Sequence, residues 1–144
     1  MSIVETSDID HVTVDALAIA STRFEHMERA WNAADGAASG AAFSDATEFV
    51  NIRGEHFRGD GSLIGNAHQA IFDTIYLGST ITYVVDVARV VAPGCIVAVV
   101  TSTLTAPTGP LQGEHQSRIT AVLTQHDGDW SIVAFQNTLV ANIV

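Results

Sequence analysis

The tripeptide Gly-Glu-His occurs twice, at residues 54–56 and 113–115, and an Arg follows each copy closely. A carboxylate next to an imidazole can bind a metal ion or move protons. Neighbouring residues of a strand point to opposite faces, so Glu55 and His56 cannot hold one ion without a bulge. No pair of histidines has the spacing of a helical metal site. We therefore expect no metal ion, and each copy predicts a turn glycine that leads into a strand.

The orientation of each Gly-Glu-His copy is left open by the sequence. If His56 faces a pocket, Arg58 shares its face and Glu55 points away, because alternate residues of a strand share a face. His56 is therefore a candidate proton carrier. The recurrence of the tripeptide itself is interpreted as coincidence, since three residues are too few for an internal repeat.

His68 is the best placed histidine for acid–base chemistry. It interrupts an apolar line with helical spacing that consists of Ile64, His68, Ile71 and Ile75. That line must face a sheet, and in an apolar cavity desolvation and a neighbouring charge tune a titratable group for proton transfer. The alternative is a core histidine that is satisfied by one hydrogen bond.

Polar residues on two predicted strands form a second group of candidates. Asn51 lies on the strand 47–53, and Gln136 and Asn137 lie on the last strand. Both faces of the last strand mix apolar and polar residues, so parity does not show which face looks inward. A buried amide needs a hydrogen-bonding partner, so each of these residues is either a pocket group that orients a ligand or a surface residue.

Arg118 begins the third long strand and is a candidate oxyanion partner. At the mouth of a cavity its guanidinium would hold a carboxylate or enolate with two hydrogen bonds. A surface ion pair with Glu114 is the alternative. Trp31 and Phe135 are expected in the apolar wall, where Trp31 can stack on a flat ligand.

The glycine-rich string at residues 59–65 (GDGSLIG) superficially resembles a dinucleotide-binding fingerprint. It has one residue too many before its last glycine, and the strands that follow predict antiparallel pairing rather than a βαβ unit. The string is better explained as a turn with Asp60 or Ser62 capping a helix. We therefore predict no nicotinamide cofactor and no other cofactor.

Composition narrows the class of protein further. The 144 residues carry a formal net charge of -10, and all six basic residues are Arg. A polyanion would be repelled, which disfavours nucleic acid and anionic membranes as partners, and the lack of Lys excludes Schiff-base chemistry. Cys95 is the only cysteine, so no intramolecular disulfide forms. The acidic N-terminus shows no signal peptide, and we expect a soluble, cytoplasmic protein.

Hydrophobic periodicity predicts the elements that must position these residues. Residues 1–12 are expected to be a loose lead-in and residues 13–144 a single domain. Helical patterns cover residues 14–34, 37–43 and 62–75. Extended patterns cover residues 47–53, 56–58, 80–91, 95–106, 115–126 and 130–140. Because short turns join the last four strands, they predict an antiparallel meander in an α+β fold, with helices on one face of a curved sheet.

Several strings resemble the NTF2-like (SnoaL-like) superfamily and its SgcJ/EcaC family. The strings are residues 28–35 (ERAWNAAD), 43–50 (FSDATEFV), 51–59 (NIRGEHFRG), 70–80 (AIFDTIYLGST) and 130–140 (WSIVAFQNTLV). The resemblance covers residues 13–142. It implies a cone in which a curved, mainly antiparallel sheet and three helices from the N-terminal half enclose a pocket.

The resemblance also implies two functions from different classes. SgcJ/EcaC proteins occur in natural-product gene clusters, including those for enediyne antibiotics. One hypothesis is therefore a protein that binds a hydrophobic polyketide-type molecule and catalyses cofactor-free isomerisation, cyclisation or dehydration. His68 or His56 would carry the proton, Arg118 would stabilise an oxyanion and Asn51 would orient the ligand. The alternative is a binding or accessory protein that holds a polyene intermediate. The superfamily pairs open sheet faces, so we expect a homodimer.

Overall fold

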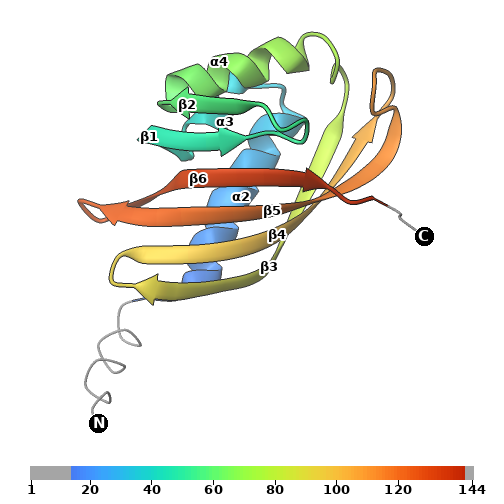
Figure 1. Ribbon diagram of the computed structural model, residues 1–144. Coiled ribbons are helices and arrows are strands. Elements are labelled where there is room, and N and C mark those ends of the chain that lie inside the picture. The colour runs from blue at the N-terminus through green and yellow to red at the C-terminus, as the bar shows by residue number, and fades with distance from the viewer. Residues whose placement is uncertain (1–13, 142–144) are drawn as a thin grey trace.

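The computed structural model describes residues 14–141, so the expected lead-in at residues 1–12 lies outside the described residues. Within these residues the chain forms three helices and six strands, which Figure 1 labels. The helices are α2 (Ala16–Asn32), α3 (Gly36–Gly40) and α4 (Gly61–Phe72). The strands are β1 (Phe43–Val50), β2 (His56–Gly59), β3 (Thr80–Ala92), β4 (Cys95–Ala106), β5 (Gly113–His126) and β6 (Asp129–Leu139).

Aspartates cap all three helices. The side chains of Asp15, Asp35 and Asp60 accept hydrogen bonds from backbone N–H groups in the first turns of α2, α3 and α4. Helix α4 ends at Phe72, three residues earlier than its apolar pattern predicts. Residues 73–78 form turns instead, and Gly78 has a φ of 76°. The predicted helix 62–75 is therefore corrected to Gly61–Phe72.

One sheet contains all six strands, in the order β2-β1-β6-β5-β4-β3. The pairing is antiparallel except between β1 and β6, which are parallel, and the predicted meander of four long strands is confirmed. The predicted strand 47–53 is corrected to Phe43–Val50. It ends early because the side chain of Asn51 accepts hydrogen bonds from the backbone N–H groups of Arg53 and Glu55, which folds a turn.

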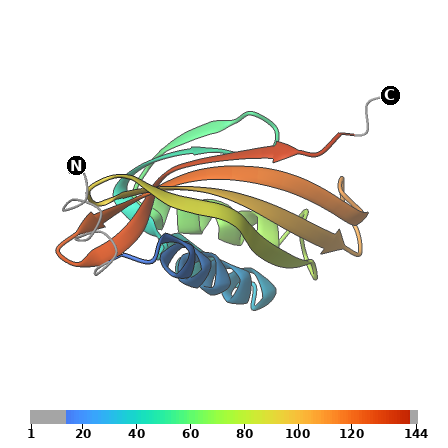
Figure 2. The same cartoon turned by 90° about the horizontal axis from the view of Figure 1, so that it is seen from below.

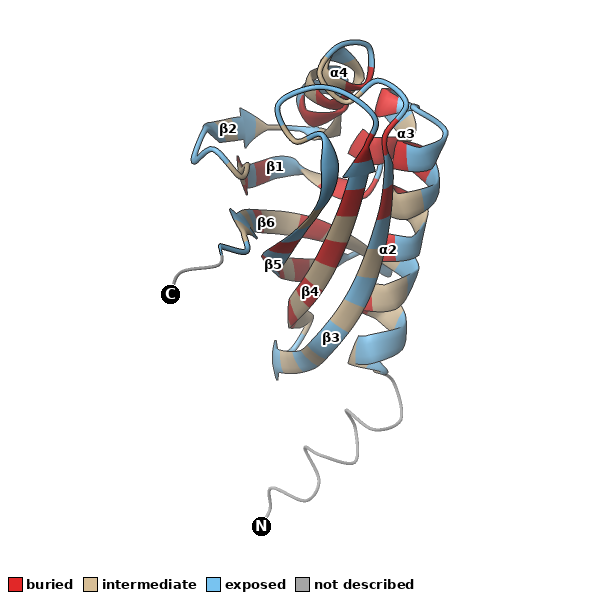
Figure 3. Ribbon diagram, turned by 90° about the vertical axis from the view of Figure 1, so that its right-hand side faces the viewer, coloured by how far each residue is buried: buried red, intermediate tan, exposed pale blue. Residues whose placement is uncertain are grey.

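The sheet is bent, and the helices lie on its concave side. Register shifts interrupt β3 at two points and the β5–β6 and β1–β6 pairings at one point each. Bulges of this kind bend strands and increase their twist. Figure 2 shows α2 and α4 beneath the curved sheet, and Figure 3 shows buried residues alternating with less buried ones along β4. The α+β NTF2-like fold expected from the sequence is confirmed.

Alternation along β4 shows which face is inside. Ile96, Ala98 and Val100 are fully buried, whereas Val97 and Val99 between them are half-buried on the outer face. The inner residues join Phe24 and Met27 of α2 in the main hydrophobic cluster. No helix covers the outer face in the described part of the chain (Figure 2).

Helices α3 and α4 touch through glycines. A methyl group on Gly65 would lie 2.7 Å from the carbonyl oxygen of Gly36, so no other residue fits there without displacement. The backbone N–H of Gly36 also donates to Oε1 of Gln69 at 2.7 Å. These contacts fix α4, and with it His68, relative to the rest of the fold.

Candidate functional site

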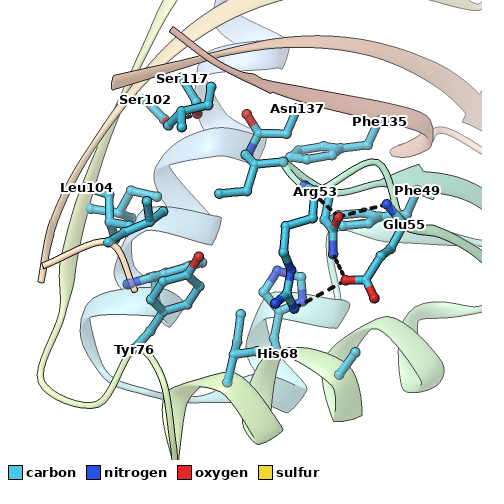
Figure 4. Close-up of a pocket in the computed structure, with 18 of the residues that line it drawn as sticks. Phe49, Arg53, Glu55, His68, Tyr76, Ser102, Leu104, Ser117, Phe135 and Asn137 are labelled. Atoms are coloured by element: carbon cyan, nitrogen blue, oxygen red, sulfur yellow. Dashed lines mark hydrogen bonds and ion pairs between the residues drawn. The ribbon is translucent and has the colours of Figure 1, made fainter. Parts of the chain in front are cut away.

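A cavity of about 160 Å³ lies between the concave face of the sheet and α4. Its walls are mainly apolar and come from α2, α4, the turns after α4 and all six strands of the sheet (Figure 4). Among the apolar lining residues are Phe49, Ile71, Ile75, Leu104, Leu111 and Leu139. A cavity of this kind is suited to a hydrophobic small molecule.

His68 is the titratable group on the α4 side of the cavity. It is 8% exposed, and its Nδ1 lies 2.9 Å from the carbonyl oxygen of Ile64. Burial lowers the pKa of His68, and the hydrogen bond to Ile64 opposes this shift without cancelling it. The ring therefore stays neutral at neutral pH, and none of the described residues forms a hydrogen bond with Nε2.

Tyr76 supplies a hydroxyl group to the same cavity. Burial raises the pKa of Tyr76, and the positive charge of Arg53 opposes the shift. The phenol therefore remains a hydrogen-bond donor throughout the physiological pH range. Figure 4 shows its oxygen directed into the cavity, in the space between the sheet and His68.

Trp31 links His68 and Tyr76. Its ring centroid lies 6.1 Å from that of His68 and 5.6 Å from that of Tyr76. Its indole Nε1 donates to Oγ of Ser79 at 2.9 Å, so the polar atom of the tryptophan is satisfied away from the cavity. Trp31 thus packs against both His68 and Tyr76 through its apolar ring.

Two stacked phenylalanine rings form the wall of the cavity next to His68. Phe49 and Phe135 are stacked with centroids 4.5 Å apart and an interplanar angle of 3°, across the parallel β1–β6 pair. The ring of His68 meets Phe49 edge to face at 5.6 Å. This packing excludes water from one side of the imidazole, which is the cause of its lowered pKa.

The turn after β1 forms a polar rim. Asn51 donates through Nδ2 to Oε1 of Glu55 at 2.9 Å, and Nη2 of Arg53 lies 3.2 Å from the same oxygen. The Arg53 and Glu55 side chains are 63% and 53% exposed, so the pair lies at the solvent side of the cavity (Figure 4). Asn51 thus holds the rim together.

Ser102, Ser117 and Asn137 lie close together on the inner face of the sheet. We call these three residues the sheet polar patch. Ser102 of β4 and Ser117 of β5 are directly opposed in the register, and their hydroxyl groups hydrogen-bond to each other. Oδ1 of Asn137 is buried and has no hydrogen-bond partner among the described residues. Figure 4 shows the patch on the sheet side of the cavity and His68 on the helix side.

The structure brings five of the eight predicted site residues together. These are Trp31, Asn51, His68, Phe135 and Asn137, and all of them line the cavity. His68 is a core histidine with one hydrogen bond, as the alternative interpretation had it, and it also lines the cavity.

The other three predicted site residues lie elsewhere. His56 and Arg118 are exposed on the outer face, and Gln136 is exposed beside Asn137. His56 is bonded instead to Glu48, its Nε2 lying 2.6 Å from Oε1, and Arg58 shares that carboxylate. The expected placement of all three in the cavity is corrected, because strand alternation puts their neighbours inside. For the two Gly-Glu-His copies this means that Glu55 and His115 line the cavity.

Several lining residues were not identified from the sequence. Ser102 and Ser117 alternate with buried apolar residues on their strands, so parity was the signal that could have found them once the inner face was known. Arg53 is two residues from Asn51 and four from Phe49, so alternation along the predicted strand places it on the same face as these two lining residues. Tyr76 lies in the turns after α4 and carries no periodic signal.

Neither a metal cluster nor a spanning helix is found in residues 14–141. No three His, Cys, Asp or Glu side chains converge there as metal ligands would. The carboxylate of Asp60, in the glycine-rich string, is bonded to the backbone N–H of Leu63. None of the described helices has the length and apolar character to cross a bilayer.

Solved structures with the same fold are similar to this chain over most of its length. A domain of unknown function with a cystatin-like fold from Nostoc punctiforme is 25% identical, with a TM-score of 0.78, and 90% of this chain and 82% of that one are covered. An uncharacterized protein with a cystatin-like fold from Caulobacter vibrioides is 28% identical, with a TM-score of 0.76 and coverage of 86% and 89%.

A ketosteroid isomerase-like protein from Erwinia carotovora atroseptica is 14% identical, with a TM-score of 0.71 and coverage of 88% and 97%. At that identity the likeness shows the fold alone. None of the curated proteins compared with this chain matches it.

A bent sheet closed by helices over an apolar cavity defines an α+β protein of the NTF2-like class, whose fold is also called cystatin-like. Within that class, the model of the SnoaL-like domain family matches residues 18–140. The chain belongs to the SnoaL-like domain family.

Proposed function

We propose that this chain binds a hydrophobic small molecule with an enolisable carbonyl group and catalyses a cofactor-free proton transfer on it. The observation that carries the proposal is the state of His68. Its Nδ1 is committed to the Ile64 carbonyl, its pKa is lowered by burial, and its Nε2 is free of described partners in an apolar cavity. Such a nitrogen is a base that needs no deprotonation at neutral pH.

The proposed chemistry uses His68 and Tyr76 as a pair. Nε2 of His68 takes a proton from the carbon next to the carbonyl, and the C–H electron pair moves to the carbonyl oxygen. The hydroxyl of Tyr76, whose pKa is raised, donates a hydrogen bond to the developing enolate. Return of the proton from His68 to another carbon isomerises the molecule. Attack of the enolate carbon on a second carbonyl carbon, whose oxygen takes that proton, gives cyclisation. Loss of a β-hydroxyl group, which leaves as water with that proton, gives dehydration. Groups whose environments drive their pKa values apart are suited to such paired roles.

The proposed setting is natural-product biosynthesis in the cytoplasm, for a molecule of polyketide or enediyne type. It is supported by the resemblance of residues 51–59 and 130–140 to the SgcJ/EcaC branch.

The second candidate function is binding without chemistry, for example holding a hydrophobic polyene intermediate. A specific observation favours it: among residues 14–141, the only carboxylate that lines the cavity is that of Glu55, which lies on the rim and is bonded to Asn51 and Arg53. His68 therefore has no acidic partner in the cavity to stabilise its protonated form.

Deuterium exchange distinguishes the two candidates. The α-protons of 2-tetralone exchange in D2O through an enolate, and NMR follows the loss of the proton signals. We expect the wild type to accelerate exchange and His68→Phe to abolish the acceleration, because phenylalanine fits the aromatic surroundings but has no basic nitrogen. His126→Gln is the matched control, since that histidine is 89% exposed at the end of β5.

Binding of 2-naphthol, measured by calorimetry, completes the test. Wild-type exchange that His68→Phe removes while binding persists supports the enzyme. Binding without accelerated exchange contradicts the enzyme and supports the binding protein. If neither probe binds, the cavity is not a site for small molecules and both candidates fail.

We also propose that the chain forms a homodimer through the outer face of its sheet. Val84 and Val87 of β3 are 59% and 50% exposed there, beside the half-buried Val97 and Val99 of β4. Exposed apolar side chains gathered on a sheet face are typical of a protein interface.

A further inference from the structure

Asn137 carries an unmet hydrogen-bonding demand. Its Oδ1 is buried without a partner, and none of the described residues accepts a hydrogen bond from its Nδ2. Buried polar atoms are almost always partnered by protein, water or ligand, because losing hydration without replacement is costly. An apolar side chain would avoid that cost, and Leu139, two residues along the same face, shows that leucine is accommodated in this wall.

The serines next to Asn137 have one hydroxyl proton that they do not use in their mutual hydrogen bond. Ser117 and Asn137 lie diagonally on adjacent strands, since Ser117 pairs with Leu139 and Ile119 pairs with Asn137. The hydrogen bond between Ser102 and Ser117 uses only one of the two hydroxyl protons. The sheet polar patch therefore offers one unused acceptor, Oδ1 of Asn137, and one unused donor, a serine O–H.

A hydroxyl group satisfies both at once. Its proton donates to Oδ1 of Asn137 and its oxygen accepts from the serine. A carbonyl oxygen, which only accepts, would leave Asn137 Oδ1 unsatisfied, and a hydrocarbon would leave both groups unsatisfied. The chemistry of the patch thus discriminates among ligands that are equally hydrophobic.

We propose that the sheet polar patch binds a hydroxyl group of the ligand, so that the ligand class of this protein is the hydroxylated ketones. The carbonyl part of this class rests on the proposed function of His68 and Tyr76, whereas the hydroxyl part rests on the patch alone. The ligand spans the cavity, with its enolisable carbonyl on the α4 side and its hydroxyl on the sheet side (Figure 4).

Calorimetric titration with three matched probes tests the hydroxyl site. The probes are 2-naphthol, 2-methoxynaphthalene and naphthalene, of which only the first can donate a hydrogen bond. One net hydrogen bond predicts that the wild type binds 2-naphthol about tenfold more tightly than the other two. Asn137→Leu is expected to bind all three with similar affinity, because its wall has no acceptor. Thr138→Val is the matched control, since Thr138 is exposed on the outer face, opposite Arg118.

Thermal unfolding shows whether Asn137→Leu folds, and Ser117→Ala is a second variant of the same patch. Asn137→Leu should unfold at a temperature no lower than that of the wild type, because an unpartnered polar atom is removed. If it fails to fold, Ser117→Ala takes its place and should reduce the preference for 2-naphthol severalfold.

Two results would contradict a hydroxyl site at the sheet polar patch. A wild type that binds 2-methoxynaphthalene as tightly as 2-naphthol contradicts the hydroxyl site, as does a preference that survives in Asn137→Leu. Both results are obtained without turnover, so they leave the proton-transfer proposal intact. Conversely, a wild type that prefers 2-naphthol but does not accelerate exchange overturns the catalytic role of His68 and leaves the hydroxyl site standing. Failure of every probe to bind overturns both.

Discussion

Nδ1 of His68 lies 2.9 Å from the carbonyl oxygen of Ile64, one turn earlier in α4. A carbonyl oxygen only accepts hydrogen bonds, so Nδ1 carries the proton of the neutral ring. Nε2, on the other side of the imidazole, is therefore the unprotonated nitrogen. One backbone atom of the helix thus sets which nitrogen of His68 is the base, as in other sites where a hydrogen bond to one ring nitrogen fixes the role of the other.

His68 should make the stability of the protein depend on pH. Its pKa is lowered in the folded state, from an ordinary value of 6.5. Below pH 6.5 the unfolded chain therefore binds a proton that the folded chain does not, and stability is lost as the pH falls towards the folded pKa. The contribution is fully present above pH 6.5. We expect the wild type to lose up to about 1.4 kcal/mol per pH unit below this value, relative to His68→Phe.

Urea unfolding of both proteins at pH 7.5 and pH 5.5 measures the effect. The other titrating groups are common to both proteins and cancel in the comparison. A difference in unfolding free energy between wild type and His68→Phe that is the same at both pH values would show that His68 titrates normally.

Tyr76→Phe should reduce the proposed exchange reaction without preventing ligand binding. The hydroxyl donates only to charge that develops on the carbonyl oxygen, and removal of such a donor costs about 10²-fold or more in rate. The exchange of 2-tetralone and the calorimetric affinity for 2-naphthol measure the two effects. Tyr83→Phe removes a hydroxyl from a tyrosine that packs against Phe24, at a centroid distance of 5.3 Å, and should change the rate far less. Equal losses in the two variants would argue against a specific role for Tyr76.

Ser79→Ala should destabilise the fold. It leaves the indole N–H of Trp31 without its acceptor, and Trp31 is only 8% exposed. A buried donor without a partner costs about 1–3 kcal/mol, which thermal or urea unfolding detects. In a Trp31→Phe background the same serine substitution should cost much less, since no donor is left unsatisfied. An equal cost in both backgrounds would mean that Ser79 acts through packing rather than through the hydrogen bond.

Light scattering tests the proposed homodimer. We expect a mass of twice 15.2 kDa at micromolar concentration, and a shift to the monomer mass in Val84→Asp/Val87→Asp, which places charges on the outer face of β3. Leu17→Asp is the matched control, because Leu17 is 50% exposed on α2, on the other side of the sheet. A wild type of 15.2 kDa, or dissociation caused equally by Leu17→Asp, would contradict dimerisation through the outer face.

The long strands were predictable because their turns carry strong local signals. Asp127 and Gly128, with φ values of 51° and 86°, form the β5–β6 turn, as an Asp-Gly pair between extended runs indicates. The end of α4 was not predictable from periodicity. Ile75 continues the apolar spacing of Ile64 and Ile71 and does line the cavity, yet it does so from a turn outside the helix.

The site was predictable only in part because alternation gives two faces and does not say which is inside. On β6 the choice is made by Phe135, whose stacking on Phe49 turns Asn137 inward and Gln136 outward. The same kind of choice sends Arg118 outward, since Ser117 and Ile119 on either side of it are buried. Which face of a strand packs against the helices is determined by tertiary packing, and the sequence of a single strand does not show it.

The contact of α3 with α4 at Gly36 and Gly65 fixes the backbone position of α4, whereas the side chains that line the cavity are free to change. Because no side chain fits between these backbones, evolution cannot widen the cavity by moving α4 outward at this point and keep the contact. New ligand specificities on this scaffold must arise instead by exchange of cavity side chains such as Ala67 and Ile71, whose backbone positions the glycines hold constant. For protein engineering, the same contact identifies which positions to leave untouched in a library and which to randomise.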